Sequence, residues 1–180
     1  MLSAPLNLTG HTEPDVFNVL YPYFYRDFVA APTYLNGSIF VDPAAHGHRD
    51  GKEEIFWHIT TREQSRKVKQ GGRMQTIKLR LFDPDRSARI EWVKQIIDHH
   101  RHPDIRLFYR KESKGKKPIR MYLWAHQYDF VVIVQKLGRS DAYLVTSFYI
   151  TETYKRNSYQ TWYNDYVSGN RPELLNCEWF

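Results

Sequence analysis

The chain has 180 residues, of which 42% are hydrophobic, enough for a folded core, and its formal net charge is +6. The single cysteine, Cys177, excludes an internal disulfide, and no run approaches the ~18 apolar residues of a membrane helix. Because the N-terminus also lacks a basic segment followed by an apolar one, as in a signal peptide, we expect a soluble, cytoplasmic protein with no membrane partner.

The positive charge lies in the middle of the chain. Residues 1–55 carry three Lys or Arg and seven Asp or Glu, residues 56–150 carry twenty and nine, and residues 151–180 carry three and four. The central block therefore has a net charge of +11 between mildly acidic ends. Such segregation indicates one surface for a polyanion, with nucleic acid as the first candidate.

The first half of the chain alternates between irregular and periodic stretches. Residues 1–54 hold five of the nine prolines and predict an irregular arm that packs on the domain or on a partner. After the apolar run 55–61, the polar and basic residues 62–75 predict a loop or a frayed helix start. Residues 77–81 alternate and predict a strand with one buried and one cationic face. Asp83 and the proline after it predict the start of a helix that ends near Pro103.

The second half predicts four strands in succession, joined by connections short enough for hairpins, at residues 105–110, 119–124, 130–134 and 142–150. Residues 111–117 predict a basic hairpin tip, and residues 152–167 a closing helix. The expected fold class is α+β, with a helix packed on a four-stranded antiparallel meander. The expected domain organisation is an arm at 1–54, a domain at 55–168 and a tail at 169–180.

One face of the first two meander strands combines arginines with aromatic rings. Period-two alternation places it away from the helix, where charge for phosphates and rings for bases would suit single-stranded nucleic acid. The alternative is a solvated face with cross-strand cation–π pairs. The residues of this face are Arg106, Phe108, Arg110, Arg120, Tyr122 and Trp124.

His58 is the best candidate for acid–base chemistry, because its apolar neighbours open its pKa to a shift. The alternative is a satisfied core histidine. Arg62 and Arg66 follow closely and could face the same phosphate. Arg86 and Arg89 are three residues apart on the predicted helix and either pair with carboxylates or point into a cleft.

Two groups of histidines invite a metal interpretation: His46 with His48, and His99 with His100 and His102. Neither has the converging partners that zinc needs, so we expect no metal or other cofactor. Cations near a helix C-terminus are favoured by the helix dipole in any case.

Three blocks in chain order resemble a known family: Phe56-Trp57-His58-Ile59, then residues 83–97, then residues 143–149 with Thr146, Ser147 and Tyr149. They resemble the phage-associated branch of the barnase–EndoU–colicin E5/D–RelE-like (BECR) ribonuclease superfamily, over roughly residues 50–160. The resemblance implies a helix on a four-stranded antiparallel sheet and a metal-independent ribonuclease, often a toxin or a prophage-encoded effector.

The resemblance also implies roles for individual residues. His58 would be the acid–base residue, Arg89 (or Arg86) and Arg120 would neutralise the phosphate, and Thr146 with Tyr149 would position it. Ser147 stands where the family usually has a small residue after the Thr. Substrate contacts are expected from four arginines, two aromatic rings and one hydroxyl: Arg62, Arg86, Arg106, Arg110, Tyr122, Trp124 and Ser147.

We therefore expect an endoribonuclease in which the RNA 2′-OH attacks the adjacent phosphate and leaves a 2′,3′-cyclic phosphate. RNA would be the substrate, and an antitoxin or immunity protein a possible partner. Two other functions stay open: a non-catalytic nucleic-acid-binding module, and a phage or mobile-element protein that binds a host protein through the arm. The acidic arm could also cover the basic site as an internal inhibitor.

Overall fold

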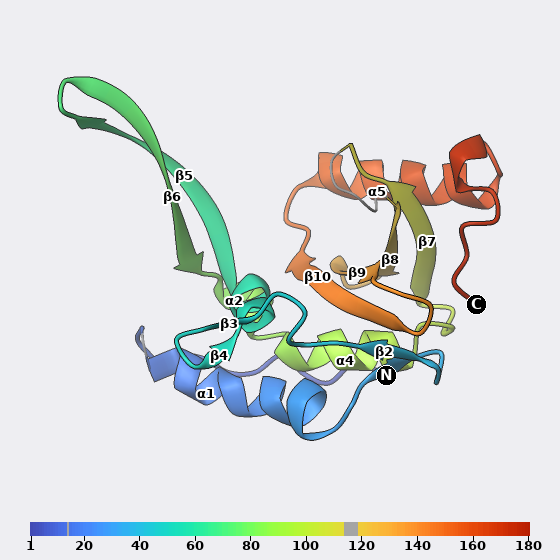
Figure 1. The fold of residues 1–180 in the computed structure, drawn as a ribbon, viewed down its shortest axis with the longest axis horizontal. Coiled ribbons are helices and arrows are strands. Elements are labelled where there is room, and N and C mark those ends of the chain that lie inside the picture. Colours follow the sequence, from blue (N-terminus) through green and yellow to red (C-terminus); the bar gives the residue numbers. More distant parts are fainter. Residues whose placement is uncertain (14, 114–118) are drawn as a thin grey trace.

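A computed structural model describes residues 1–13, 15–113 and 119–180 (Figure 1). The basic tip predicted at residues 111–117 falls mostly on residues 114–118, outside the described residues. The fold is a mixture of helices and a mainly antiparallel sheet, so the predicted α+β class is confirmed.

The central sheet has six strands in the order β1-β2-β10-β9-β8-β7. The last four are antiparallel neighbours along the chain, because short apolar and alternating segments are joined by tight connections. The sheet is wider than the predicted four strands, because β2 adds to the edge of β10 in parallel, with Phe40 opposite Asp141. The strands are β1 (Tyr34–Leu35), β2 (Ile39–Val41), β7 (Ile105–Lys111), β8 (Ile119–Ala125), β9 (Phe130–Lys136) and β10 (Asp141–Tyr149).

The N-terminal segment helps to form the main core. Helix α1 (Asp15–Phe24) continues into a π-helical turn, Tyr25–Ala30, and buries Leu20 and Phe24. The prediction of an irregular arm is therefore wrong for residues 15–41, although residues 1–13 form no helix or strand. This segment fills one side of the hydrophobic core, so it is not a detachable cover for the basic block.

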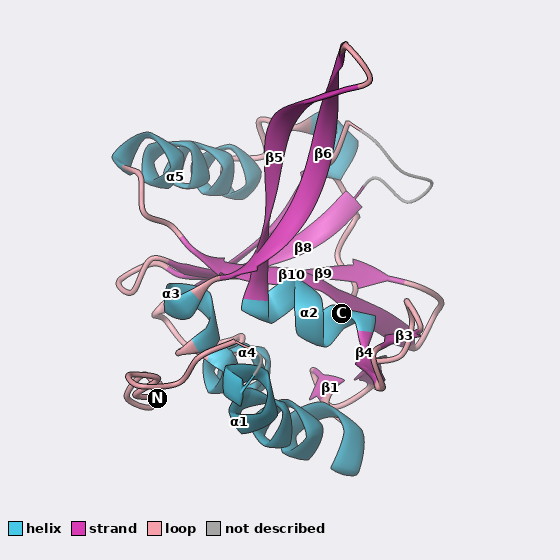
Figure 2. Cartoon of the chain, turned by 90° about the vertical axis from the view of Figure 1, so that its left-hand side faces the viewer, coloured by secondary structure: helices cyan, strands magenta, loops and turns pink. Residues whose placement is uncertain are grey.

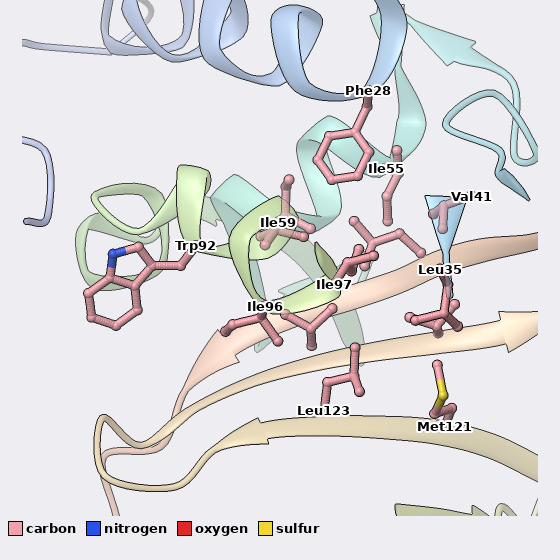
Figure 3. Close-up of a cluster of buried hydrophobic side chains, with 14 of the residues drawn as sticks. Phe28, Leu35, Val41, Ile55, Ile59, Trp92, Ile96, Ile97, Met121 and Leu123 are labelled. Carbon is pink, nitrogen blue, oxygen red and sulfur yellow. The ribbon is translucent and has the colours of Figure 1, made fainter. Parts of the chain in front are cut away.

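Helix α4 (Ile90–Asp98) packs on one face of the sheet, and α1 packs against α4 on the side away from the sheet (Figures 1 and 3). Ile96 and Ile97 lie against Leu123 in this core. The helix predicted to begin after Asp83 is divided in two, since α3 (Pro84–Ser87) precedes α4 and the chain turns between them. Asp83 caps α3 as predicted, with its carboxylate accepting from the Arg86 backbone N–H at 3.1 Å.

Helix α5 (Thr153–Val167) covers the other face of the sheet, where it confirms the predicted closing helix. Tyr159 of α5 packs against Phe108, Tyr122 and Trp124 in a second aromatic core. The prediction of an open, nucleic-acid-binding sheet face is therefore wrong: Tyr122 and Trp124 are buried, because α5 buries the rings that the alternation placed on this face.

A two-stranded ribbon, β5 (Thr61–Gln70) and β6 (Arg73–Phe82), projects away from the rest of the chain (Figures 1 and 2). Gly71 and Gly72 form its turn with φ of +59° and +79°, which suits a tight two-residue hairpin loop. The prediction of a loop or frayed helix at 62–75 is wrong. The predicted buried face of residues 77–81 is also wrong, since Leu79 and Leu81 are exposed on a ribbon that packs only at its root.

The remaining elements are short. Strands β3 (His48–Arg49) and β4 (Lys52–Glu53) pair before helix α2 (Glu54–Thr60), and a 3-10 turn, Pro172–Leu174, lies in the C-terminal segment. The predicted domain boundary at 54/55 therefore falls inside the first turn of α2. Within the described ranges, no helix combines the length and the apolar character needed to cross a bilayer.

Candidate functional site

Helix α2 holds His58 at the edge of the sheet. Ile55, Phe56 and Ile59 are buried in the main core, which leaves the opposite side of this short helix half-exposed. His58 lies on that side, and 34% of its side chain is exposed. It is thus a surface-accessible histidine on a helix anchored in the core, and not a core histidine.

Glu54 and Arg49 lie beside His58. His58 Nε2 is 3.4 Å from Glu54 Oε1, one helical turn back along α2, and Glu54 Oε2 is 3.5 Å from Arg49 Nε. Trp57 fixes Arg49, because its indole N–H donates to the Arg49 carbonyl at 3.0 Å and its ring lies 5.1 Å from the guanidinium. One carboxylate thus joins a histidine and an arginine.

The root of the ribbon brings a second arginine to this group. Arg80 Nη1 donates to Thr61 Oγ1 at 3.1 Å, and the Arg80 charge acts on the His58 ring. Burial and the nearby Arg49 lower the pKa of Arg80, against the opposing effect of Glu54 and Glu63. Two guanidinium groups therefore share one small region, an arrangement that favours an anionic ligand such as a phosphate.

The pKa of His58 is lowered from its ordinary value, mainly by burial and then by the charge of Arg80. Glu54 and the Val145 carbonyl act in the opposite direction, and His46 adds to the lowering. A lowered pKa leaves the imidazole neutral at neutral pH, which is the form that accepts a proton.

Thr146 is the other predicted catalytic residue in direct contact with α2. A bulge in β10 between Leu144 and Thr146 alters the pairing there, and Thr146 Oγ1 lies 3.4 Å from the His58 carbonyl oxygen. Its neighbour Ser147 is fully buried, and its hydroxyl has no hydrogen-bond partner among the described residues. Ser147 thus lies inside the core, away from any exposed site.

Arg89 and Tyr149, which were both predicted to act on the phosphate at His58, contact each other. The Arg89 guanidinium lies 4.5 Å from the Tyr149 ring, and it donates to the Asp85 carbonyl at 2.6 Å. This pair joins the α3–α4 connection to the end of β10.

Arg86 supports the backbone at the C-terminal end of α2. Its guanidinium donates to the carbonyls of His58 and Thr61 at 2.7 and 2.8 Å, and so closes the C-terminal end of α2. Burial lowers the pKa of Arg86 to about 10. The side chain that was predicted to bind substrate is engaged with the backbone that carries His58.

Arg62 lies on the other face of the ribbon root from Arg80, with Nε 4.0 Å from Asp83. Together with Arg86 and Tyr149 it lines a cavity of about 520 Å³ between α3, the end of β10 and α5. His58 is not among the residues that line this cavity. Two of the predicted site residues, Arg62 on the ribbon and His58 on α2, therefore lie in different surroundings.

The predicted arginines of the meander strands contact α5 or the sheet. Arg106 stacks on Trp124 and Tyr163, at 5.2 and 5.0 Å, and Arg110 stacks on Trp162 at 3.8 Å. Arg120 donates to Gln135 at 3.3 Å on the neighbouring strand β9. Arg120 is thus separated from β10 by a strand and is not brought to His58.

Among the described residues, no three His, Cys, Asp or Glu side chains converge in a way that could hold a metal ion. His46 packs edge-on against Tyr143 at 4.5 Å, and His48 lies 3.6 Å from Glu53. His100 is buried at the end of α4, with Nδ1 2.9 Å from the Ile97 carbonyl.

The sequence interpretation missed Glu54, Arg49 and Arg80. The four-residue spacing of Glu54 and His58 on a helix was a usable signal, since such residues lie on one face. Arg80 and Arg49 come close only through the hairpin register and the β3–β4 turn, for which the local sequence carries no signal.

Comparisons of the chain with protein-family models, with curated proteins and with solved structures find no match.

Proposed function

We propose that this protein is a metal-independent endoribonuclease with His58 as its proton-transfer residue. The observation that supports it is the group formed by a half-exposed histidine, a carboxylate 3.4 Å away and two arginines. In this proposal the helix and meander correspond to the BECR-like domain, and the chain acts as a toxin-like or prophage-encoded effector.

The proposed reaction is an intramolecular transesterification. Neutral His58 takes the proton of the 2′-OH, the 2′ oxygen bonds to phosphorus, and the bond from phosphorus to the 5′ oxygen breaks. The products are a 2′,3′-cyclic phosphate and a 5′-hydroxyl, with His46 the nearby group that would return a proton to the leaving oxygen. Arg49 and Arg80 would stabilise the charge that develops on the phosphate, and Glu54 the imidazolium.

The test is cleavage of total RNA in the presence of EDTA. We expect His58→Ala to lower the rate by ~10²–10⁴-fold, the usual contribution of a positioned acid–base group. His99→Ala removes an exposed histidine at the end of α4 and is the matched control, with unchanged cleavage expected. Equal cleavage by His58→Ala and wild type removes His58 from the mechanism, and no cleavage by wild type removes the ribonuclease proposal.

A non-catalytic nucleic-acid-binding module is the second candidate, and the basic ribbon favours it. This candidate predicts salt-dependent binding of RNA without turnover. Expression gives an inexpensive distinction, since an active ribonuclease harms its host unless an antitoxin or immunity protein is present, whereas a binding module does not depend on one.

A further inference from the structure

The β5–β6 ribbon concentrates the positive charge of the chain. Residues 61–82 contain seven Lys or Arg and one Glu, which gives a net charge of +6, equal to the formal net charge of the whole chain. Apart from the root, where Thr61 is buried, these side chains are exposed or half-exposed. Figures 1 and 2 show that the ribbon extends clear of the sheet and helices.

The strand register divides this charge between two faces. Residues that are directly opposite in an antiparallel pair point to the same side. One face carries one cation at each of four successive levels, from the root to the tip: Arg80 opposite Glu63, Lys78 opposite Ser65, Lys67 opposite Thr76, and Lys69 opposite Met74. We name the residues Arg80, Lys78, Lys67 and Lys69 the cation track.

The other face is different in character. Arg62, Arg66 and Arg73 share it with four apolar side chains, so its cations are interrupted. The apolar residues are Val68, Ile77, Leu79 and Leu81. Glu63 lies on the first face with its Oε1 2.9 Å from Lys78 Nζ, so the two faces carry the same net charge. Only the first face has a cation at four successive levels.

The cation track leads to the candidate site. Arg80, at its root, donates from Nη1 to Thr61 Oγ1 at 3.1 Å, and Thr61 directly follows the last residue of α2, the helix that carries His58. The charge of Arg80 also lowers the pKa of His58. Successive levels are two residues apart, or ~7 Å at the rise of a β-strand. That spacing is on the scale of the repeat between phosphates along one extended strand.

The chemistry of the ribbon suits phosphates and not bases. No Phe, Tyr or Trp lies between residues 62 and 81, so this stretch offers no ring for base stacking. Lysine is a compact, strongly hydrated cation that binds phosphate as a point charge. Contacts of this kind position a strand without reading its sequence.

We propose that the cation track binds the phosphate backbone of single-stranded RNA and guides the strand to His58. The proposal rests on the proposed function for the reaction at its end, and on the ribbon alone for binding. A duplex is a poorer fit, because the major groove of A-form RNA is deep and narrow, whereas one strand can follow one line of cations.

Binding can be measured without cleavage, using the His58→Ala protein and a fluorescently labelled oligo(U) in a salt titration. In that background we compare Lys67→Gln/Lys69→Gln on the track with Arg66→Gln/Arg73→Gln on the opposite face. The pairs remove the same charge from neighbouring exposed positions. Loss of two phosphate contacts lowers the salt slope by ~1.4, which is about 20-fold in affinity near 0.1 M salt. We expect this for the track pair and less than about threefold for the control pair.

Three outcomes overturn the proposal. Equal losses in both pairs indicate diffuse attraction of a polyanion, and no loss in either places the RNA elsewhere. If poly-glutamate binds as tightly as oligo(U) and responds in the same way to the track pair, the ligand is an acidic protein. If duplex RNA does so, the ligand is a duplex. Track-dependent binding by a wild-type protein that cleaves no RNA removes the ribonuclease proposal and leaves this one intact.

Discussion

His58 and Glu54 face each other across one turn of α2, with Nε2 and Oε1 3.4 Å apart. The carboxylate stabilises the protonated ring, while burial and Arg80 stabilise the neutral ring. The balance favours the neutral ring, so the pKa of His58 is lowered in spite of the adjacent carboxylate. The two residues that act in opposite directions come from different elements, a helix and the root of the ribbon.

Neutralising Glu54 and neutralising Arg80 should shift the pKa of His58 in opposite directions. Glu54→Gln removes the group that raises this pKa, so we expect a lower value than in wild type. Arg80→Gln removes a group that lowers it, so we expect a higher value. Titration of the histidine Cε1–H resonances by NMR measures both, with assignment from His58→Ala. Shifts of the same sign in the two variants would falsify the described arrangement of charges.

The aromatic rings beneath α5 should contribute to stability instead of RNA contact. Trp124 is 1% exposed and packs on Tyr159, so Trp124→Ala is expected to lower the free energy of unfolding by ~3–5 kcal/mol. Urea denaturation measures this. Tyr154→Ala is the control, since Tyr154 lies on α5 and is 67% exposed, and it should change the free energy of unfolding little. A fully stable Trp124→Ala protein with impaired RNA binding would support the open sheet face instead.

The difference between the predicted and observed sheet faces has a physical cause. The alternation in 105–110 and 119–124 correctly predicted the strands and the partition of their side chains, because period-two patterning is local. What covers each face is a tertiary property. Helix α5 does carry rings at three- and four-residue spacing, and these rings pack on the sheet, but the spacing alone does not indicate which face of the sheet they cover. They are Tyr159, Trp162, Tyr163 and Tyr166.

The ribbon and the candidate site also depend on tertiary pairing that the local sequence does not indicate. Val68 is the only apolar residue of β5, so residues 61–70 carry no alternation, and the strand depends on its pairing with β6. His58 stands out as a candidate in the sequence because a histidine in an apolar run is conspicuous. Arg80 joins it through the register of the ribbon, and Arg49 through the β3–β4 turn, which no local pattern specifies.

Helix α1 should be essential to the folded domain. Leu20 is fully buried in the main core, so Leu20→Ala is expected to lower the free energy of unfolding by ~2–5 kcal/mol. Asn18→Ala, at an exposed position on the same helix, is the control.

By the same reasoning, deletion of residues 1–54 should give a protein without cooperative thermal unfolding. Cooperative unfolding of that truncated protein, measured by circular dichroism, would restore the view of a separable arm.

Stability should fall on mild acidification because of His100. Burial, and to a smaller extent Arg101, lower the pKa of this histidine, so the unfolded chain binds its proton more readily than the folded one. The contribution is fully present above the ordinary histidine pKa of ~6.5 and is lost as pH falls through the lower folded value. His100→Gln should therefore flatten the dependence of urea stability between about pH 7.5 and 5.5. His99→Gln, at the exposed neighbouring position, should leave the wild-type slope; equal slopes in all three proteins would exclude His100 as the source.

Arg86 should act on the His58 site through the backbone of α2. Arg86→Met removes the donor to the Thr61 carbonyl and the closer donor to the His58 carbonyl, which keeps a 3.4 Å contact from Thr146 Oγ1. A buried carbonyl left without a partner costs ~1–3 kcal/mol of unfolding free energy. Arg139→Met, at an exposed position, is the control for loss of an arginine and should be neutral. Thermal denaturation measures the stability, and the salt slope of oligo(U) binding separates the two possible roles. A residue that only supports α2 lowers stability and leaves the slope unchanged, whereas a phosphate-binding Arg86 would lower the slope by ~0.7 in the folded variant.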